Sequence, residues 1–426
     1  MSNWLKQTIG DLINKGVIEP PMDGNHGEKH PKGSDFVNCG IPFIMASDIN
    51  NGIIDFHNCK FITQKQADSL RKGFSINGDV LLTHKATIGR TAIVSNIKYP
   101  YLMLSPQVTY YRIKNHDFLS NIFLKYYFDS KPFQETIGLW AGAGSTRAYL
   151  GITGQHNLTI RIPDIDTQRK ISTVLSRLDT KINLNNRINV ELEAMVKQIY
   201  DYWFVQFDFP DTNGKPYKSS GGKMIYNEVL KQHIPIEWMV KSLNEITQVS
   251  KKTISPAEFT NKKFRYYSIP TFDEIGTFRF EYGAKIGSNK FTVSENDILI
   301  SKLNPWFNRV IYSVEEDSQI CSTEFVVWSC GSKEMKNFLY QIARNQNFIN
   351  YCTQSATGTS NSHKRVNPNV MMQFKIPYKK DIVMNYGEKI NDFIKKIILN
   401  KEENITLSNL RDWLLPMLMN GQVKVK

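Results

Sequence analysis

The chain has 426 residues, 41% of them apolar, so it is long enough for two or three domains with cores of their own. It carries 53 Lys and Arg against 40 Asp and Glu, and the resulting charge of +13 and pI near 9.3 favour a polyanionic partner. Its five scattered cysteines argue against a disulfide framework and a zinc ribbon. Without a signal-like N-terminus or a long apolar run, we expect a soluble, cytoplasmic protein with no membrane span.

The chain contains one internal repeat. Four pairs of segments match in the same order, at offsets that fall from 234 to 214 residues: Trp4–Asp11 with Trp238–Glu245, Asn77–Thr83 with Glu295–Ser301, Ala143–Thr146 with Thr357–Ser360, and Ile160–Pro163 with Phe374–Pro377. Each match is short, but their shared order is hard to obtain by chance. The repeat therefore predicts two similar domains whose loops differ in length.

Each half ends in a segment with the apolar spacing of a coiled coil. In the first half we expect a helix of roughly 55 Å that starts with Asp166 as its N-cap and runs to about Phe204. Its apolar seam is Ile171, Leu175, Leu178, Ile182, Leu192, Val196, Ile199 and Trp203. At an offset of 215 residues the seam returns as Ile390, Phe393, Ile397, Leu407, Leu414 and Leu418, which predicts a second long helix.

Four asparagines occupy matching polar positions in these seams. They are Asn185 and Asn189 in the first helix and Asn400 and Asn404 in the second. Buried Asn weakens the packing of a coiled coil but fixes its register, because an Asn opposite Leu lacks a hydrogen-bond partner. We expect the four to select how the helices pair; the alternative is that they are simply exposed. Arg411 also interrupts the second seam.

A stretch rich in turn formers separates the two halves. It follows Phe207–Pro210 and includes Asn213, Gly214 and Ser219–Gly222. We predict globular domains at 1–162 and 235–377, long helices at 163–206 and 378–426, and a linker at 207–234. Inside the domains, strands are expected at Thr91–Val94 and Glu324–Trp328, and helices at Phe118–Phe128 and Met335–Asn345. The fold class is α+β, with two mixed domains in tandem repeat separated by two long helices.

These motifs resemble the DNA-specificity subunit of type I restriction–modification systems over nearly the whole chain. The most specific segments are Ile162-Pro163 with Gln168, Leu175, Leu178-Asp179, Ile182, Tyr202–Val205, the linker segments Phe207–Pro210 and Asn213–Met224, Ile234-Pro235 with Trp238, and, within the domains, Gly78–Leu82, Leu303–Pro305 and Arg309-Val310.

The resemblance implies that each globular half is a target-recognition domain for one part of a split DNA site. It also implies that the two helices pair antiparallel and dock two modification (methyltransferase) subunits, which restriction or motor subunits join. The chain itself would be non-catalytic and bind no cofactor, with S-adenosylmethionine, ATP and magnesium held by the partner subunits. Such a complex acts in defence against foreign DNA.

Elementary geometry agrees with this role. Two similar domains on a rigid antiparallel helix pair are related by a pseudo-two-fold axis, so one chain can address two half-sites of double-stranded DNA as a dimer does. The length of the helices then sets the spacing, on the order of one DNA turn or ~34 Å between half-site centres.

Three segments have features of enzymes, and each has a plainer interpretation. Asn304–Phe307 resembles the Asn-Pro-Pro-aromatic loop of amino-methyltransferases, but its third residue differs and no glycine-rich turn for a methyl donor precedes it. Ala141–Gly144 reads as a loop, and the glycines and proline around His26–His30 prevent a helix from presenting both His side chains to a metal. The alternatives are a self-contained methyltransferase or nuclease with fused recognition domains, and an interaction protein whose coiled coil only dimerises.

Candidate DNA contacts are basic, amide and hydroxyl residues in loops. Those of the first half are His84, Lys85, Thr87, Arg90, Ser145, Thr146 and Arg147. Those of the second half are Lys251, Lys252, Lys262, Lys263, Arg265, Lys302, Asn304, Asn308, Arg309, Thr359, Ser360, Ser362, His363, Lys364 and Arg365. Positions that match across the repeat, such as Ser145 with Thr359, are the stronger candidates.

Overall fold

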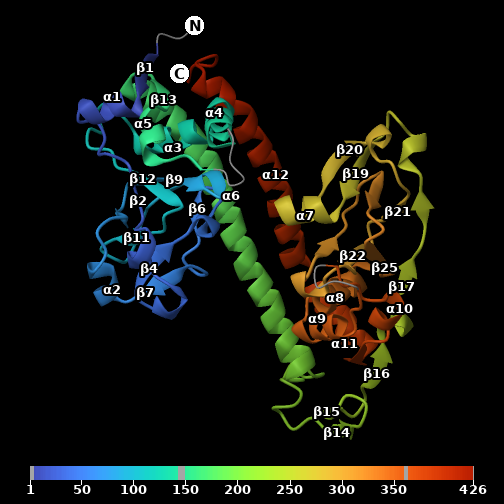
Figure 1. Cartoon of the computed structure of the whole chain (residues 1–426). Coiled ribbons are helices and arrows are strands. Elements are labelled where there is room, and N and C mark those ends of the chain that lie inside the picture. Colours follow the sequence, from blue (N-terminus) through green and yellow to red (C-terminus); the bar gives the residue numbers. More distant parts are fainter. Residues whose placement is uncertain (1–3, 143–148, 359–362, 426) are drawn as a thin grey trace. The chain divides into compact units, whose positions relative to one another are not determined.

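The computed structural model of the chain describes residues 4–142, 149–358 and 363–425 (Figure 1). The chain forms two compact units, which we name the first unit (1–183 with 404–426) and the second unit (184–403). Each unit therefore combines one globular half with a portion of both long helices, whereas the sequence boundaries set the helices apart from the globular halves.

The first unit is built on three sheets and a small hairpin, with strand orders β1-β13, β10-β9-β12-β2, β3-β7-β4-β11-β8 and β5-β6. The strands are β1 Leu5–Thr8, β2 Met22–Asp23, β3 Phe36–Val37, β4 Ile41–Ile44, β5 Ile49–Asn50, β6 Ile53–Ile54, β7 Lys60–Ile62, β8 Phe74–Ser75, β9 Val80–Lys85, β10 Thr87–Ile93, β11 Leu102–Leu104, β12 Val108–Tyr111 and β13 Thr159–Ile162. Its shorter α-helices are α1 Ile9–Asn14, α2 Gln64–Asp68, α3 Asn121–Asp129, α4 Lys131–Gly142 and α5 Ile152–His156.

The second unit has sheets with strand orders β16-β26, β17-β25-β22-β23, β18-β21-β24-β19-β20 and β14-β15. The strands are β14 Met224–Asn227, β15 Gln232–Pro235, β16 Met239–Ser242, β17 Gln248–Ser250, β18 Thr253–Ile254, β19 Lys263–Tyr267, β20 Arg279–Tyr282, β21 Lys290–Thr292, β22 Asp297–Ser301, β23 Val310–Tyr312, β24 Gln319–Cys321, β25 Phe325–Ser329 and β26 Lys375–Tyr378. Its shorter α-helices are α7 Ile269–Ile275, α8 Lys333–Ala343, α9 Gln346–Gln354, α10 Pro368–Met371 and α11 Lys380–Lys389.

The two units share the same sheet architecture except for one edge strand of the five-stranded sheet: β3 pairs with β7, whereas β18 lies at the opposite edge, beside β21. The four-stranded sheet β10-β9-β12-β2 corresponds strand by strand to β23-β22-β25-β17. Each five-stranded sheet has one parallel pair at its centre, β4 with β11 and β19 with β24. The prediction of an α+β fold with a duplicated domain is therefore confirmed, and the strands and helices expected from the sequence overlap β10, β25, α3 and α8.

The two long helices are present as predicted. Helix α6, Ile165–Tyr200, has 36 residues and continues into a π-helical turn at Asp201–Val205. Helix α12, Asn391–Met419, has 29 residues and follows α11. Portions of α6 and α12 belong to each unit.

The start of α6 differs from the expectation by two residues. Asp164, and not Asp166, caps the helix: its carboxylate accepts hydrogen bonds from the Thr167 backbone N–H (2.8 Å) and hydroxyl (2.7 Å). These bonds lower the pKa of Asp164. Asp166 lies in the first turn, where a carboxylate also favours the helix dipole.

A close approach explains the break between α11 and α12. Gly387 lies against α8, so that a Cβ at this position would come within 2.1 Å of the Glu334 carbonyl oxygen. The Asn337 side chain donates to the Gly387 carbonyl at 2.8 Å. This carbonyl would otherwise accept a hydrogen bond from the next turn of a continuous helix. Helix α8 can therefore pack this closely only against a glycine.

In the second unit α6 and α12 pair antiparallel through three of the four seam asparagines. Asn400 donates to the Asn189 side-chain carbonyl at 2.8 Å, and Asn185 donates to Glu403 at 2.8 Å. The partner number falls as the α6 number rises, which is the antiparallel sense. Asn185, Asn189 and Asn400 are 0%, 6% and 1% exposed, so the alternative that they face solvent is wrong for them, while Asn404 is half-buried.

In the first unit a charged group joins the same two helices. Arg411 of α12, the residue that interrupts the seam, donates to Asp179 of α6 at 2.9 Å. The other oxygen of Asp179 accepts from the Tyr126 hydroxyl of α3 at 2.6 Å. The seam residue Leu418 and its neighbour Leu415 are buried in the apolar core of this unit together with the seam residues Ile171 and Leu175 of α6. The polar interruption therefore has a specific partner.

The first residues of the predicted linker lie in the core of the second unit. Phe207 and Phe209 are 2% and 4% exposed and pack with Trp238 in the main core of the second unit. The same core contains Trp203 and Phe204 from the end of α6. Further along, the linker forms the hairpin β14-β15. The start of the linker is thus fixed to the second unit by aromatic packing.

Candidate nucleic-acid interface

Backbone hydrogen bonds identify two equivalent surface sites, one in each unit. In the first unit the His84 N–H donates to the Gln107 carbonyl at 2.9 Å. In the second unit the Lys302 N–H donates to the Glu324 carbonyl at 3.0 Å. Each bond joins the end of one central strand of the four-stranded sheet, β9 or β22, to the residue just before the other central strand, β12 or β25. The two sites therefore have the same backbone framework.

A second strand-like contact completes each site. Lys85 forms an antiparallel bridge with Tyr149, and Leu303 forms one with Arg365. The side chains at the three matched positions define two surfaces. We name them the first rim, made of Lys85, Gln107 and Tyr149, and the second rim, made of Leu303, Glu324 and Arg365.

The first rim presents a cation, an amide and an aromatic ring. The Lys85 Nζ lies 5.7 Å from the centroid of the Tyr149 ring, within reach of a cation–π interaction. Tyr149 is 46% exposed, and Lys85 and Gln107 are half-buried. All three groups are of kinds that contact bases or phosphates in protein–DNA complexes.

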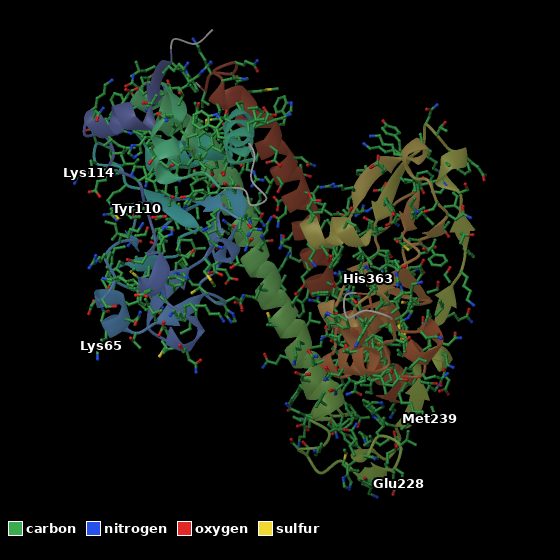
Figure 2. All side chains as sticks on the ribbon, viewed as in Figure 1. Lys65, Tyr110, Lys114, Glu228, Met239 and His363 are labelled. Carbon is green, nitrogen blue, oxygen red and sulfur yellow. The ribbon has the colours of Figure 1, made fainter. Side chains whose placement is uncertain are left out.

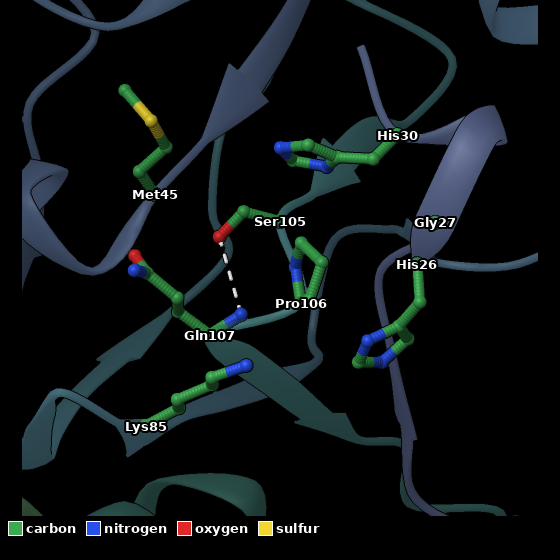
Figure 3. A pocket seen from close by; sticks show the side chains of 8 residues that line it. All are labelled: His26, Gly27, His30, Met45, Lys85, Ser105, Pro106 and Gln107. Carbon is green, nitrogen blue, oxygen red and sulfur yellow. Dashed lines mark hydrogen bonds between the residues drawn. The ribbon is translucent and has the colours of Figure 1, made fainter. Parts of the chain in front are cut away.

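A hollow of about 340 Å³ opens beside the first rim. Figure 3 shows Lys85 and Gln107 along one side of it and His26 and His30 along the other. The lining is completed by Gly27, Met45, Ser105 and Pro106. The hollow is far larger than the ~30 Å³ that one water molecule occupies, so it offers room for a polar group of a ligand.

A buried carboxylate orders one wall of the hollow. Asp23 of β2 accepts hydrogen bonds from His26 Nε2 at 2.6 Å and from the Lys72 ammonium group. Burial raises the pKa of Asp23, but these hydrogen bonds outweigh burial and the net pKa is lowered. The ionised Asp23 therefore fixes the orientation of the His26 ring.

His84 does not reach the surface as the sequence suggested. It lies within β9, is 1% exposed, and its Nδ1 is 2.9 Å from the Leu150 carbonyl. Burial lowers its pKa, although the nearby Asp23 opposes that effect. We expected His84 in a loop, but strand β9 continues to Lys85, and its first five residues are all buried, His84 among them.

Arg90 and Arg309, both expected as DNA contacts, act as internal braces at matched positions. Arg90 Nη1 donates to the carbonyls of Ala46 and Ile49, each at 3.2 Å, and to the Asn50 side chain at 2.7 Å. These acceptors lie in the segment that follows β4.

Arg309 binds the corresponding segment after β19. It makes a bidentate pair with Asp273 of α7 at 2.6 and 2.8 Å and donates to the Leu303 carbonyl at 3.2 Å. Its side chain is 8% exposed. The two arginines therefore tie the four-stranded sheet to the segment that follows β4 or β19. Arg309 is too buried for base contact, whereas Arg90 is half-buried.

Arg265 is also internal. Its side chain is 6% exposed, pairs with Glu402 of α12 at 2.7 Å, and lies 3.6 Å from the centroid of the Phe278 ring. The sequence placed it in a basic loop with Lys262 and Lys263, but it lies in β19, where alternate side chains face the interior.

Asn304 and Asn308 shape a loop. Both adopt left-handed backbone conformations, with φ of 48° and 49°, around the short helix Pro305–Phe307. The Asn304 N–H donates to the Lys364 carbonyl at 2.7 Å, and its side-chain oxygen accepts from the Lys364 N–H at 3.0 Å. Asn304 is 8% exposed, so the segment that resembled a methyltransferase loop serves to join two backbone segments.

The remaining described candidates lie on or near the surface. Thr87, Lys251, Lys252, Lys262, Lys263, His363 and Arg365 are exposed, while Lys302 and Lys364 are half-buried. Figure 2 labels His363 beside the second four-stranded sheet. Ser145, Thr146, Arg147, Thr359, Ser360 and Ser362 lie outside the described residues.

Sequence patterns did not identify Gln107, Tyr149 or Glu324 as candidate DNA contacts. Gln107 and Glu324 each precede a buried strand, β12 and β25, 217 residues apart. Extending the repeat through these strands would have matched them. Their side chains carried no motif, which is why composition alone did not reveal them.

The described residues provide neither a metal-binding cluster nor a membrane-spanning helix. Within residues 4–142, 149–358 and 363–425, no three His, Cys, Asp or Glu side chains are placed to hold a metal ion. In the same described part of the chain, no helix combines the length and apolar content that crossing a bilayer requires.

Comparison with known proteins gives consistent matches. Residues 1–194 match the family model of the type I restriction modification DNA specificity domain. The specificity subunit of type I restriction enzyme MjaIX of Methanocaldococcus jannaschii is 25% identical, over 91% of this chain and 87% of that subunit. The specificity subunit of type I restriction enzyme HindI of Haemophilus influenzae is 23% identical, over 99% of this chain and 100% of that subunit. The crystal structure of the type I restriction-modification S subunit from M. genitalium shares the fold, with a TM-score of 0.59 and 16% identity over 98% of this chain and 96% of that one.

Proposed function

Because this chain belongs to the family of type I restriction–modification DNA-specificity subunits, we propose that it reads a bipartite target on double-stranded DNA for such a complex. In this role it is non-catalytic. It docks two modification subunits, which methylate the target, and restriction or motor subunits join that core. The complex works in the cytoplasm in defence against foreign DNA.

One observation carries the proposal: the chain contains the same sheet architecture twice. A single recognition domain addresses one contiguous site, whereas two equivalent domains in one chain suit two separated half-sites. The antiparallel contacts between α6 and α12 in the second unit support a rigid spacer, because buried amide pairs allow few alternative registers.

The chemistry belongs to the partners in this proposal. S-adenosylmethionine, ATP and magnesium are bound by the modification and restriction subunits, and this chain supplies the position on DNA. The alternative of a self-contained methyltransferase or nuclease predicts instead that the chain alone modifies or cleaves DNA.

The test is to express the chain with the modification subunit of its own system and to sequence methylated adenines in the host genome. We expect two short motifs separated by a gap of fixed length, and no methylation when the chain is expressed alone. Methyl transfer by the purified chain alone, or a single contiguous target, would contradict the proposal.

A second test is the salt dependence of binding to duplex DNA by the complex. Each phosphate contact lowers log K by ~0.9 per log unit of salt, so about six contacts predict a loss of roughly a thousandfold between about 50 and about 200 mM salt. Fluorescence anisotropy with a labelled duplex measures this slope. A flat response would count against an interface that spans two half-sites.

A further inference from the structure

The two rims differ in chemistry although their backbone is the same. Inside the sheets, matched positions keep their character: residues 80–82 and 298–300 are all apolar, Asp79 matches Asp297, and Arg90 matches Arg309. These residues are buried or act as internal braces. Their chemistry is set by the fold, which both units share.

At the rims all three matched positions change class. A lysine in the first rim corresponds to a leucine in the second, an amide to a carboxylate, and a tyrosine to an arginine: Lys85 with Leu303, Gln107 with Glu324, and Tyr149 with Arg365. Since the fold tolerates either set on one framework, packing within the unit does not determine these side chains. We attribute the difference between the two sets of side chains to the ligand that each rim contacts.

On the basis of the proposed function, we infer that the two rims are the base-reading surfaces of the two halves. Two halves that read different half-sites need one scaffold and two sets of hydrogen-bonding groups, which is the pattern found. The ligand of each rim is the major-groove edge of a base pair, where donors and acceptors distinguish all four base pairs.

In the first rim, Gln107 and Lys85 are the reading groups. A glutamine amide can pair with adenine N6 and N7, and a lysine donates to guanine O6 or N7. Both side chains line the hollow of about 340 Å³, and Tyr149 keeps the Lys85 ammonium group near its ring. The hollow gives these groups space to meet a base edge.

In the second rim, Arg365 is the reading group and Glu324 is its positioning residue. The guanidinium donates to the two Glu324 oxygens at 2.9 and 3.3 Å, while the Arg365 side chain remains 46% exposed. An arginine fork held in this way retains further N–H donors for guanine O6 and N7. Glu324 is 30% exposed and sits at the position that Gln107 occupies in the first rim.

Four variants test the inference in cells that also express the modification subunit. Gln107→Ala and Lys85→Met alter the first rim, and Arg365→Lys and Glu324→Gln alter the second. Lys131→Ala and Lys285→Ala, whose side chains are 81% and 73% exposed, are the matched controls. The readout is the set of methylated genomic sites together with the melting temperature of each purified complex.

We expect each rim variant to relax preference at one or two base positions in one half-site only, by about tenfold to a hundredfold. The first-rim and second-rim variants should affect opposite half-sites, with the gap length, the controls and the melting temperatures unchanged. Glu324→Gln should relax the same position as Arg365→Lys, which loss of fold stability alone would not produce.

Three outcomes overturn the inference. Variants that keep the wild-type target and only methylate less everywhere would make the rims phosphate contacts. A variant that changes both half-sites, or rim variants that act on the same half-site, would contradict the assignment of one rim to each half. A wild-type complex with no split target would instead overturn the proposed function, and the inference with it.

Discussion

Each unit buries an aspartate at the same place in its four-stranded sheet, and the two units provide it with different hydrogen-bond donors. Asp79 and Asp297 lie at the same place before or at the start of the central strand and are 1% and 4% exposed. In the first unit the Arg112 guanidinium holds Asp79 with two hydrogen bonds of 2.9 Å. In the second unit the Ser329 hydroxyl, at the strand position of Arg112, donates to Asp297 at 2.9 Å.

The second unit has instead a buried lysine on a helix. Lys336 of α8 is 2% exposed and donates to the carbonyl of Glu295 and to the carbonyl and hydroxyl of Ser313. The corresponding positions of the first unit hold Leu124 of α3 and Val94, both fully buried. The repeat therefore preserves the buried acid but not its partner, which is a guanidinium in the first unit and a hydroxyl in the second.

Arg112→Ser, which gives the first unit the side chain found in the second, should destabilise the protein most. Asp79 would stay buried without its cation, and we expect a loss of about 3–5 kcal/mol. Ser329→Ala, the matched change in the second unit, should cost about 1 kcal/mol because only one neutral hydrogen bond is lost. Urea unfolding monitored by hydrogen exchange reports the stability of each unit separately.

Adding Val94→Ser and Leu124→Lys to Arg112→Ser completes the exchange. We expect it to restore part of the lost stability, since the new ammonium group would lie where Lys336 lies in the second unit. If the triple variant is no more stable than Arg112→Ser, the charge arrangement of the second unit does not transfer and the comparison fails.

The helix contacts give the next largest difference. In the second unit Asn400→Leu leaves the buried Asn189 amide without its donor, and we expect a loss of about 1–3 kcal/mol. Asn189→Leu with Asn400→Leu should recover that stability but broaden the gap lengths that the complex accepts between half-sites.

The counterpart of this change in the first unit is Arg411→Met. Arg411 and Asp179 are 28% and 22% exposed at their side chains, so we expect a cost of at most about 1 kcal/mol. Thermal unfolding measures both sets of variants. Equal losses from Asn400→Leu and Arg411→Met would refute the distinction between a buried amide pair and a partly solvated ion pair.

The smallest effects are on pH dependence, and they differ between the units. Burial lowers the pKa of Lys336 from 10.5 to about 7. Between these values the unfolded chain binds more protons than the folded one, so the stability of the second unit should rise with pH by up to about 1.3 kcal/mol per pH unit. Lys336→Met should flatten this slope in urea titrations from pH 7 to 10; an unchanged slope would exclude Lys336 as its source.

The first unit should respond at lower pH. Burial lowers the pKa of His84 below the usual histidine value of 6.5, so the unfolded chain takes up a proton first as pH falls. The stability of the first unit should therefore decrease below about pH 6.5. His84→Asn keeps a donor for the Leu150 carbonyl and should weaken this decrease; His30, whose pKa is also lowered by burial, contributes with the same sign.

Much of the fold follows from periodicity, and less of the candidate site does. The seam spacing predicted α6 and α12. The predicted burial of Asn185, Asn189 and Asn400 is confirmed, because buried polar groups in an apolar seam allow few ways of pairing the two helices. The contact candidates were selected by residue type, and type does not reveal direction. His84 and Arg265 lie in strands that turn them inward.

The duplication, the two long helices and the polar positions in their seams follow from the amino-acid sequence alone, because they depend on local spacing along the chain. The folded structure was needed to show that Arg90 and Arg309 tie two segments together, that Lys336 is buried against the carbonyls of Glu295 and Ser313, and that Gln107, Tyr149, Glu324 and Arg365 belong to two matching rims. These facts depend on contacts between residues that are tens of positions apart. No local pattern records such contacts, because strand pairing and helix packing create them only when the chain folds.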